Sequence, residues 1–143
     1  MIKPWVLDSG PLGRLAHPNP NEKVSLWLSA ELERGIPIVI PEIIDYEVRR
    51  SLLLEGLTRS LARLDQLKAG LIYLPLTTAV MLKASQLWAE ARKRGFVTSD
   101  PHALDIDVIL AAQTLQIDGR VATENVRHLS QLVDAVRWRT AHT

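Results

Sequence analysis

The chain contains no cysteine, so it can form neither disulfides nor thiolate metal sites. Aromatic residues are scarce, with one phenylalanine and two tyrosines. No apolar run approaches the length that crosses a bilayer, and the N-terminus lacks the apolar core of a signal peptide. Gly-rich phosphate loops, HExxH pairs and nucleophile elbows are also missing. These absences favour a cytoplasmic protein without a membrane partner.

The composition is that of one globular domain spanning residues 1–143, because 47% of the residues are hydrophobic and 23% are charged. The formal net charge is only +1, yet basic residues cluster along the chain. Such clusters permit a polyanionic partner, and solvation of a helix face is their alternative role. The candidate phosphate contacts are Arg49, Arg50, Arg92 and Arg94.

Short apolar runs alternate with amphipathic segments, which predicts an α/β fold with three α/β/α layers and a mostly parallel sheet of four to five strands. The expected strands are 5–7, 36–40, 71–74, 120–123 and 135–138. The expected helices are 10–16, 21–34, 41–54, 58–69, 77–94, 105–117 and 125–133, with a loop over 96–104.

The first strand runs directly into Asp8 and Ser9, and Gly10-Pro11 then breaks it. Ligands of parallel sheets collect just past the carboxyl ends of the strands, where Asp8 would lie. The alternative role of Asp8 is to cap the turn that follows.

Glu47 lies within the apolar arc of its helix, between Ile43 on one side and Ile44 and Val48 on the other. A carboxylate on a core-facing stripe needs a partner, because burying its charge alone is costly. That partner is either a buried Arg or Lys, or a bound cation.

Two further acids, Asp105 and Asp107, open an otherwise apolar helix in the expected pattern. Capping of free N–H groups is the simpler explanation for Asp105. Asp107 shares a face with Leu110 and Ala111 and therefore points inward, which favours a functional role.

After the fourth strand, Thr123-Glu124-Asn125 again places polar residues at a carboxyl end, with Asn125 as an expected N-cap and Glu124 expected to be solvated. Carboxylates that meet at one sheet edge repel one another unless a cation neutralises them. A site of oxygen ligands suits Mg²⁺ or Mn²⁺. Such ions activate water for attack on a phosphodiester, so the pattern predicts hydrolysis of that bond.

The order of these motifs resembles the PIN-domain ribonucleases, especially VapC-type toxins of bacterial toxin–antitoxin pairs, over nearly the whole chain. The resemblance implies an endoribonuclease that uses Mg²⁺ or Mn²⁺, acts on RNA, is commonly a homodimer and is inhibited by a cognate antitoxin. Carried over by position, the metal ligands are Asp8, Glu47 and Asp107, with Asp105 as an accessory catalytic acid. Ser9 and Thr123 support the site through hydrogen bonds, and Asn125 takes its last polar position.

The chain departs from that family at two places. Gly10 replaces the Asn that usually follows the first Asp-Ser/Thr step, which removes one possible hydrogen bond of the site. Glu124 and Asn125 stand where many members have a further Asp, which puts a second tightly bound metal in doubt.

Two other functions compete with this interpretation. The segment 105–108, Asp-Ile-Asp-Val, resembles the Asp-x-Asp nucleophile motif of haloacid-dehalogenase phosphatases, but it comes late in the chain, opens a helix, and no lysine follows Lys93. A non-catalytic PIN-like module that binds RNA or protein is the second alternative. Such a module should lack at least one of Asp8, Glu47 and Asp107, and all three are present.

Overall fold

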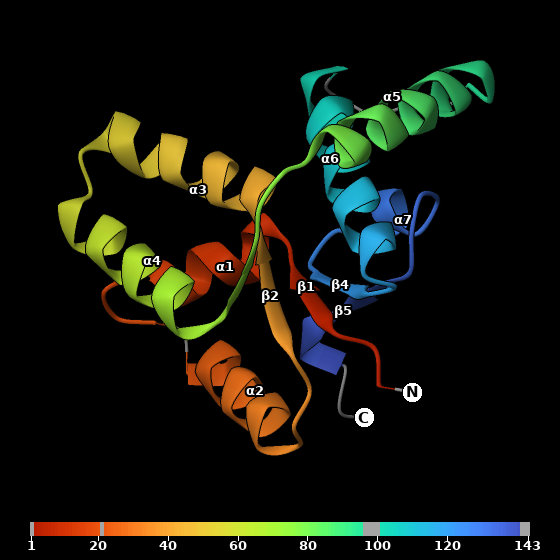
Figure 1. The fold of residues 1–143 in the computed structure, drawn as a ribbon. Coiled ribbons are helices and arrows are strands. Elements are labelled where there is room, and N and C mark those ends of the chain that lie inside the picture. The colour runs from red at the N-terminus through yellow and green to blue at the C-terminus, as the bar shows by residue number, and fades with distance from the viewer. Residues whose placement is uncertain (1, 21, 96–100, 141–143) are drawn as a thin grey trace.

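The structure, a computed structural model, describes residues 2–20, 22–95 and 101–140. Five parallel strands form one sheet in the order β3-β2-β1-β4-β5, which confirms the α/β/α fold predicted from the sequence (Figure 1). The strands are β1 (Trp5–Leu7), β2 (Ile38–Pro41), β3 (Ile72–Leu74), β4 (Arg120–Thr123) and β5 (Ala135–Arg137).

The strand order reverses at β1, which is the central strand. Val6 pairs with Val39 of β2 on one side and with Val121 of β4 on the other. In open parallel sheets, such a reversal leaves a crevice at the carboxyl ends of the two diverging strands, and ligands bind there. Here those ends are Leu7-Asp8 and Thr123.

The helices lie on both sides of the sheet, with α1 to α4 on one side and α5 to α7 on the other (Figure 1). None of the described helices is both long enough and apolar enough to cross a membrane. Their bounds are α1 (Ser9–Ala16), α2 (Glu22–Glu33), α3 (Glu42–Glu55), α4 (Thr58–Gly70), α5 (Thr78–Lys93), α6 (Pro101–Gln116) and α7 (Val126–Leu129), followed by a 3₁₀ turn, η1 (Trp138–Thr140).

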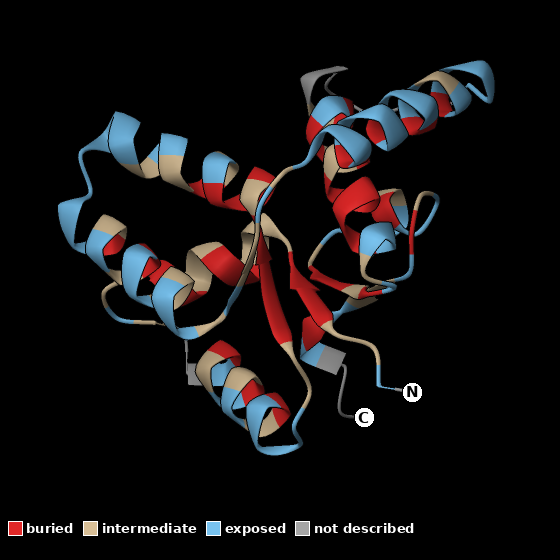
Figure 2. Cartoon of the chain, viewed as in Figure 1, coloured by how far each residue is buried: buried red, intermediate tan, exposed pale blue. Residues whose placement is uncertain are grey.

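The central strands are covered on both faces, which explains why they read as unbroken apolar runs (Figure 2). Every residue of β1 and β2 is buried. At the edge of the sheet, Ile72 of β3 is 52% exposed. Three tryptophans pack together in the core, where the ring of Trp27 contacts those of Trp5, at the start of β1, and Trp138, directly after β5.

Helix α6 begins earlier than the sequence predicts. It starts at Pro101, so residues 101–104 of the expected loop are helical, while 96–100 lie outside the described residues. Proline is compatible with a first helical turn, where its missing N–H has no partner to lose, so Pro101 starts this helix and does not break it. Asp105 and Asp107 therefore lie beyond the first turn, and the N-terminal capping explanation for them is wrong.

Two other boundaries differ from the prediction. Pro41 ends β2 and serves as the N-cap of α3, so the helix begins one residue later than expected. The last helix, α7, is a single turn. The residues after Leu129 form hydrogen-bonded turns and do not continue the helix. Thr77 caps α5, since its side chain accepts a hydrogen bond from the Val80 amide.

A buried glutamine fastens α6 to the opposite layer beside the carboxyl edge of the sheet. The Oε1 atom of Gln113 accepts a hydrogen bond from the Ile43 amide at 3.2 Å, and its Nε2 donates to the Leu74 carbonyl at 2.9 Å. Both backbone groups lie away from water, so this amide satisfies a donor and an acceptor that would otherwise be stranded.

We expect Gln113→Leu to lower the free energy of unfolding by about 3 kcal/mol, because it leaves two backbone groups without partners. Urea denaturation measures this effect. Gln116→Leu, on the exposed face of the same helix, is the matched control and should change stability by less than about 0.5 kcal/mol. Equal stability of the two variants would contradict the role of Gln113.

Candidate functional site

Asp8 is fixed by hydrogen bonds to both of its carboxylate oxygens. It is the N-cap of α1, where Oδ1 accepts from the Ser9 amide at 2.8 Å. Its Oδ2 accepts from the hydroxyl of Thr123 at 2.7 Å. The carboxyl ends of β1 and β4 are thus joined through one side chain. The N-cap role that the sequence left as an alternative is real, and it coexists with a second bond that capping does not require.

Thr123 is fully buried, and its hydroxyl both donates and accepts a hydrogen bond. While it donates to Asp8, it accepts a hydrogen bond from the Asn125 amide at 2.8 Å. Asn125 is the N-cap of α7, but its exposed side chain makes no capping bond. Asn125 therefore supports the site through its backbone.

Glu47 of α3 lies close enough to Asp8 for each charge to act on the other. Partial burial and the negative charge of Asp8 raise the pKa of Glu47, while a hydrogen bond from the Ser9 side chain and the charge of Arg50 oppose that rise. Ser9 therefore contacts two acids, Asp8 through its amide and Glu47 through its hydroxyl.

Asp107 of α6 completes the group from the other helical layer. Burial, followed by the charges of Asp8 and Glu47, raises the pKa of Asp107 to about 7. The pKa of Asp8 is raised as well, mainly by burial. Acids that act on one another in this way occupy one region, so α1, α3 and α6 each bring one carboxylate to the crevice. We refer to Asp8, Glu47 and Asp107 as the carboxylate group.

The donor chemistry of the carboxylate group fits a hard divalent cation, because it offers only oxygen atoms and its negative charges repel one another. Within the part of the chain that the structure describes, no three Asp, Glu, His or Cys side chains are grouped so that they could hold a metal ion. The fit therefore rests on charge and atom type.

The structure does not bring Asp105 to the carboxylate group. Its side chain is exposed and lines a hollow of about 410 Å³ between α5 and α6, beside Met81 and Trp88. Two residues along a helix correspond to a rotation of about 200°, so Asp105 and Asp107 face different directions.

The four predicted phosphate contacts are also dispersed. Arg49 bonds Asp45 at 2.9 Å and Asp65 at 2.8 Å, which ties α3 to α4. The guanidinium of Arg92 lies over the ring of Trp88, and Arg94 is exposed at the end of α5. Arg50 alone acts on the carboxylate group, through its charge on Glu47.

Sequence reasoning missed an ion pair beside the carboxylate group. Glu124, expected to be solvated, accepts a hydrogen bond from Nε of Arg14 at 2.6 Å and further bonds from Trp138 and Arg139. Burial opposes ionisation of Glu124, yet the bonds from Arg14 and Trp138 and the two guanidinium charges hold its pKa below the usual value. The signal in the sequence was Gly10, because a Cβ there would lie 2.8 Å from Oε2 of Glu124.

No protein-family model matches the sequence, and a search of curated proteins finds no match. Solved structures do match over nearly the whole chain. VapBC2 from Rickettsia felis, bound to a promoter DNA fragment, aligns with a TM-score of 0.77 and 14% identity, covering 95% of this chain and 98% of that chain. The chain has the fold of VapC-type PIN-domain proteins.

Other solved structures share this PIN-domain fold. FitAcB from Neisseria gonorrhoeae is 25% identical, with a TM-score of 0.68 over 94% of this chain and 97% of that chain. DNA-bound VapBC from Salmonella typhimurium is 22% identical, with a TM-score of 0.72 over 96% and 99%. The resemblance predicted from the order of the acidic motifs is confirmed by these matches.

The raised pKa of Asp107 predicts a pH-dependent stability in EDTA. The folded state binds this proton more tightly than the unfolded chain does, so the free energy of unfolding should fall as the pH rises from about 4 to about 7. Urea denaturation at several pH values measures the effect. Asp107→Asn should weaken the pH dependence, whereas Asp105→Asn should retain it. Identical pH profiles for wild type and Asp107→Asn would contradict the grouping of the acids.

Proposed function

We propose that the protein is a divalent-metal-dependent endoribonuclease that acts as the toxin of a toxin–antitoxin pair in the cytoplasm. The observation that carries the proposal is the mutual repulsion of Asp8, Glu47 and Asp107 at the crevice of the sheet. A fold gains little from holding three like charges together, which indicates that the arrangement serves a bound cation.

In this proposal, Asp8, Glu47 and Asp107 hold Mg²⁺ or Mn²⁺. When bound, the ion would polarise the phosphodiester and help to activate water for attack on phosphorus. Thr123 orients Asp8 with its hydroxyl proton, and Ser9 orients both Asp8 and Glu47. These bonds fix the direction of the carboxylate oxygens before any ligand arrives.

Glu124 limits how many cations the site would hold tightly. Its Oε1 is already shared by Arg14, Trp138 and Arg139, so this carboxylate is neutralised within the chain. Among the described residues, the carboxylate group then supplies the free anionic ligands of the crevice, which favours one firmly held ion.

The comparisons support a role in a toxin–antitoxin pair. The matched VapBC and FitAB structures contain two-protein assemblies, several of them bound to DNA. We therefore propose a small antitoxin as a partner of this chain, and RNA as the substrate.

Exposed apolar side chains support such assemblies. Leu53, Leu54 and Leu57 are exposed at the end of α3, and Leu54 is 88% exposed. On the other side of the molecule, Met81 and Trp88 project from α5 beside the hollow of about 410 Å³. Apolar groups gathered in this way commonly mark protein interfaces, so we propose a homodimer formed through α5 and an antitoxin site at the end of α3.

Purified protein should cleave single-stranded or looped RNA with Mg²⁺ or Mn²⁺ and lose this activity in EDTA. Asp8→Ala and Asp107→Asn should each lower the rate at least about 100-fold, because each removes a proposed metal ligand. Fluorescent RNA substrates resolved on gels measure the rates.

The matched control is Asp105→Asn, which removes an acid from the same helix outside the carboxylate group and should keep most of the activity. Cleavage that persists in EDTA, or in Asp8→Ala, would refute the metal-dependent mechanism. RNA binding without cleavage under every metal condition would instead favour the non-catalytic module.

The proposed homodimer predicts twice the mass of the chain in light scattering at micromolar concentration. Met81→Glu should shift the protein to monomer by placing a charge in the apolar contact, whereas Gln86→Glu, on an exposed part of the same helix, should not. A monomeric wild type would reject the dimer.

A further inference from the structure

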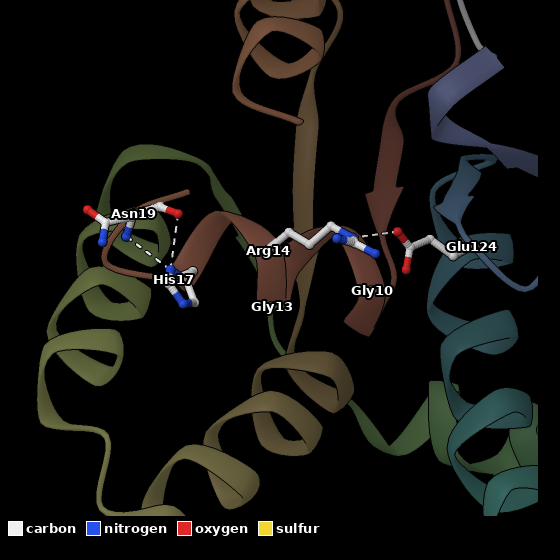
Figure 3. A pocket seen from close by; sticks show the side chains of 6 residues that line it. All are labelled: Gly10, Gly13, Arg14, His17, Asn19 and Glu124. Atoms are coloured by element: carbon white, nitrogen blue, oxygen red, sulfur yellow. Dashed lines mark hydrogen bonds and ion pairs between the residues drawn. The ribbon is translucent and has the colours of Figure 1, made fainter. Parts of the chain in front are cut away.

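A hollow of about 490 Å³ opens beside the carboxylate group. It is lined by Gly10, Gly13, Arg14, His17, Asn19 and Glu124, and we call it the α1 hollow (Figure 3). Gly10 lies two residues after Asp8, and Glu124 directly follows Thr123, which bonds Asp8. The hollow is therefore adjacent to the proposed cleavage site.

The α1 hollow is lined by one guanidinium, that of Arg14, and one carboxylate, that of Glu124. Glu124 also bonds Arg139, which lies outside the lining, so two guanidinium groups share its single charge. Arg14 uses its Nε atom for that bond, and among the described residues its two terminal nitrogens have no hydrogen-bond partner. Figure 3 shows Arg14 extended along α1 toward Glu124. Glu124 thus anchors one edge of the guanidinium and leaves the other edge to a ligand.

The floor and far end of the hollow suit a bulky anion. Gly13 leaves the helix surface bare, since a Cβ there would meet nothing within 4 Å, whereas the side chain of Glu124 covers Gly10 one helical turn earlier. At the other end, Nδ1 of His17 lies 3.0 Å from both the backbone N and O of Asn19 (Figure 3). This contact fixes the ring and leaves Nε2 available to a ligand.

We infer that the α1 hollow binds a backbone phosphate of the RNA strand next to the phosphodiester at the carboxylate group. Arg14 is the main contact, His17 a second one, and Glu124 the positioning residue for Arg14. Guanidinium groups match phosphate oxygens in geometry and charge. The inference rests on the proposed ribonuclease function and assigns the path of the strand away from the acids.

The test measures binding of a fluorescent 2′-O-methyl oligoribonucleotide, which resists cleavage, to the full chain in Mg²⁺ at several salt concentrations. Arg14→Gln should weaken binding about tenfold and reduce the salt slope by about 0.7, the value for one phosphate contact on a single strand. Lys83→Gln removes the same charge from an exposed position of α5 and should change neither quantity as much.

A second pair of variants tests the hollow without altering charge. Gly13→Leu should fill it and weaken binding several-fold, whereas Gly13→Ala should bind like wild type. This pair also decides the matter if Arg14→Gln does not fold.

The possible failures are distinguishable. Wild-type binding that neither Arg14→Gln nor Gly13→Leu weakens would overturn the α1 hollow as a phosphate site and leave the ribonuclease proposal standing. Equal losses in Arg14→Gln and Lys83→Gln, with none in Gly13→Leu, would reduce Arg14 to a general charge effect and also overturn it. A wild-type chain that neither binds nor cleaves RNA would overturn both proposals.

Discussion

The hydrogen bond from Thr123 to Asp8 joins β1 and β4, the two neighbouring strands at which the strand order of the sheet reverses. It spans 115 positions of sequence and lies at the carboxyl ends of β1 and β4. The helices that follow these strands leave on opposite sides of the sheet, so the bond marks the line along which the two helical layers meet. Every group of the candidate site is positioned relative to this line, because α1, α3 and α6 all end or pass beside it.

Electrostatic repulsion is the cost of that arrangement. Each of the three acids has a pKa raised by burial, and Glu47 and Asp107 also feel the charges of their neighbours. The chain offsets part of this cost locally, through the Thr123 hydroxyl, the Ser9 side chain and the charge of Arg50. Among the described residues, Asp107 gains no such compensation, and its pKa rises to about 7. The compensation is thus incomplete on the α6 side, where a bound cation would stabilise the ionised form of Asp107.

Much of the fold and two acids of the carboxylate group could be predicted from the sequence, because buried positions carry apolar residues at the period of a strand or a helix. Unbroken apolar runs identified β1, β2 and β4, and the helical period placed Glu47 and Asp107 inward. The start of α6 could not be predicted, since proline is equally compatible with a loop and with a first helical turn. The Arg14–Glu124 pair could not be predicted either, because its partners lie 110 positions apart and each alone looks like an ordinary surface charge. Gln113 was hidden for the same reason, since only the fold shows which backbone groups it satisfies.

The close approach of Glu124 to Gly10 couples two positions that lie far apart in the sequence. Any side chain at position 10 would collide with a carboxylate that Arg14, Trp138 and Arg139 hold in place, so relief by simple rotation of Glu124 would break those bonds. A larger residue at position 10 therefore requires either a shorter residue at position 124 or the loss of the hydrogen bonds that Glu124 accepts. The size of one residue and the length of the other are set together by this contact.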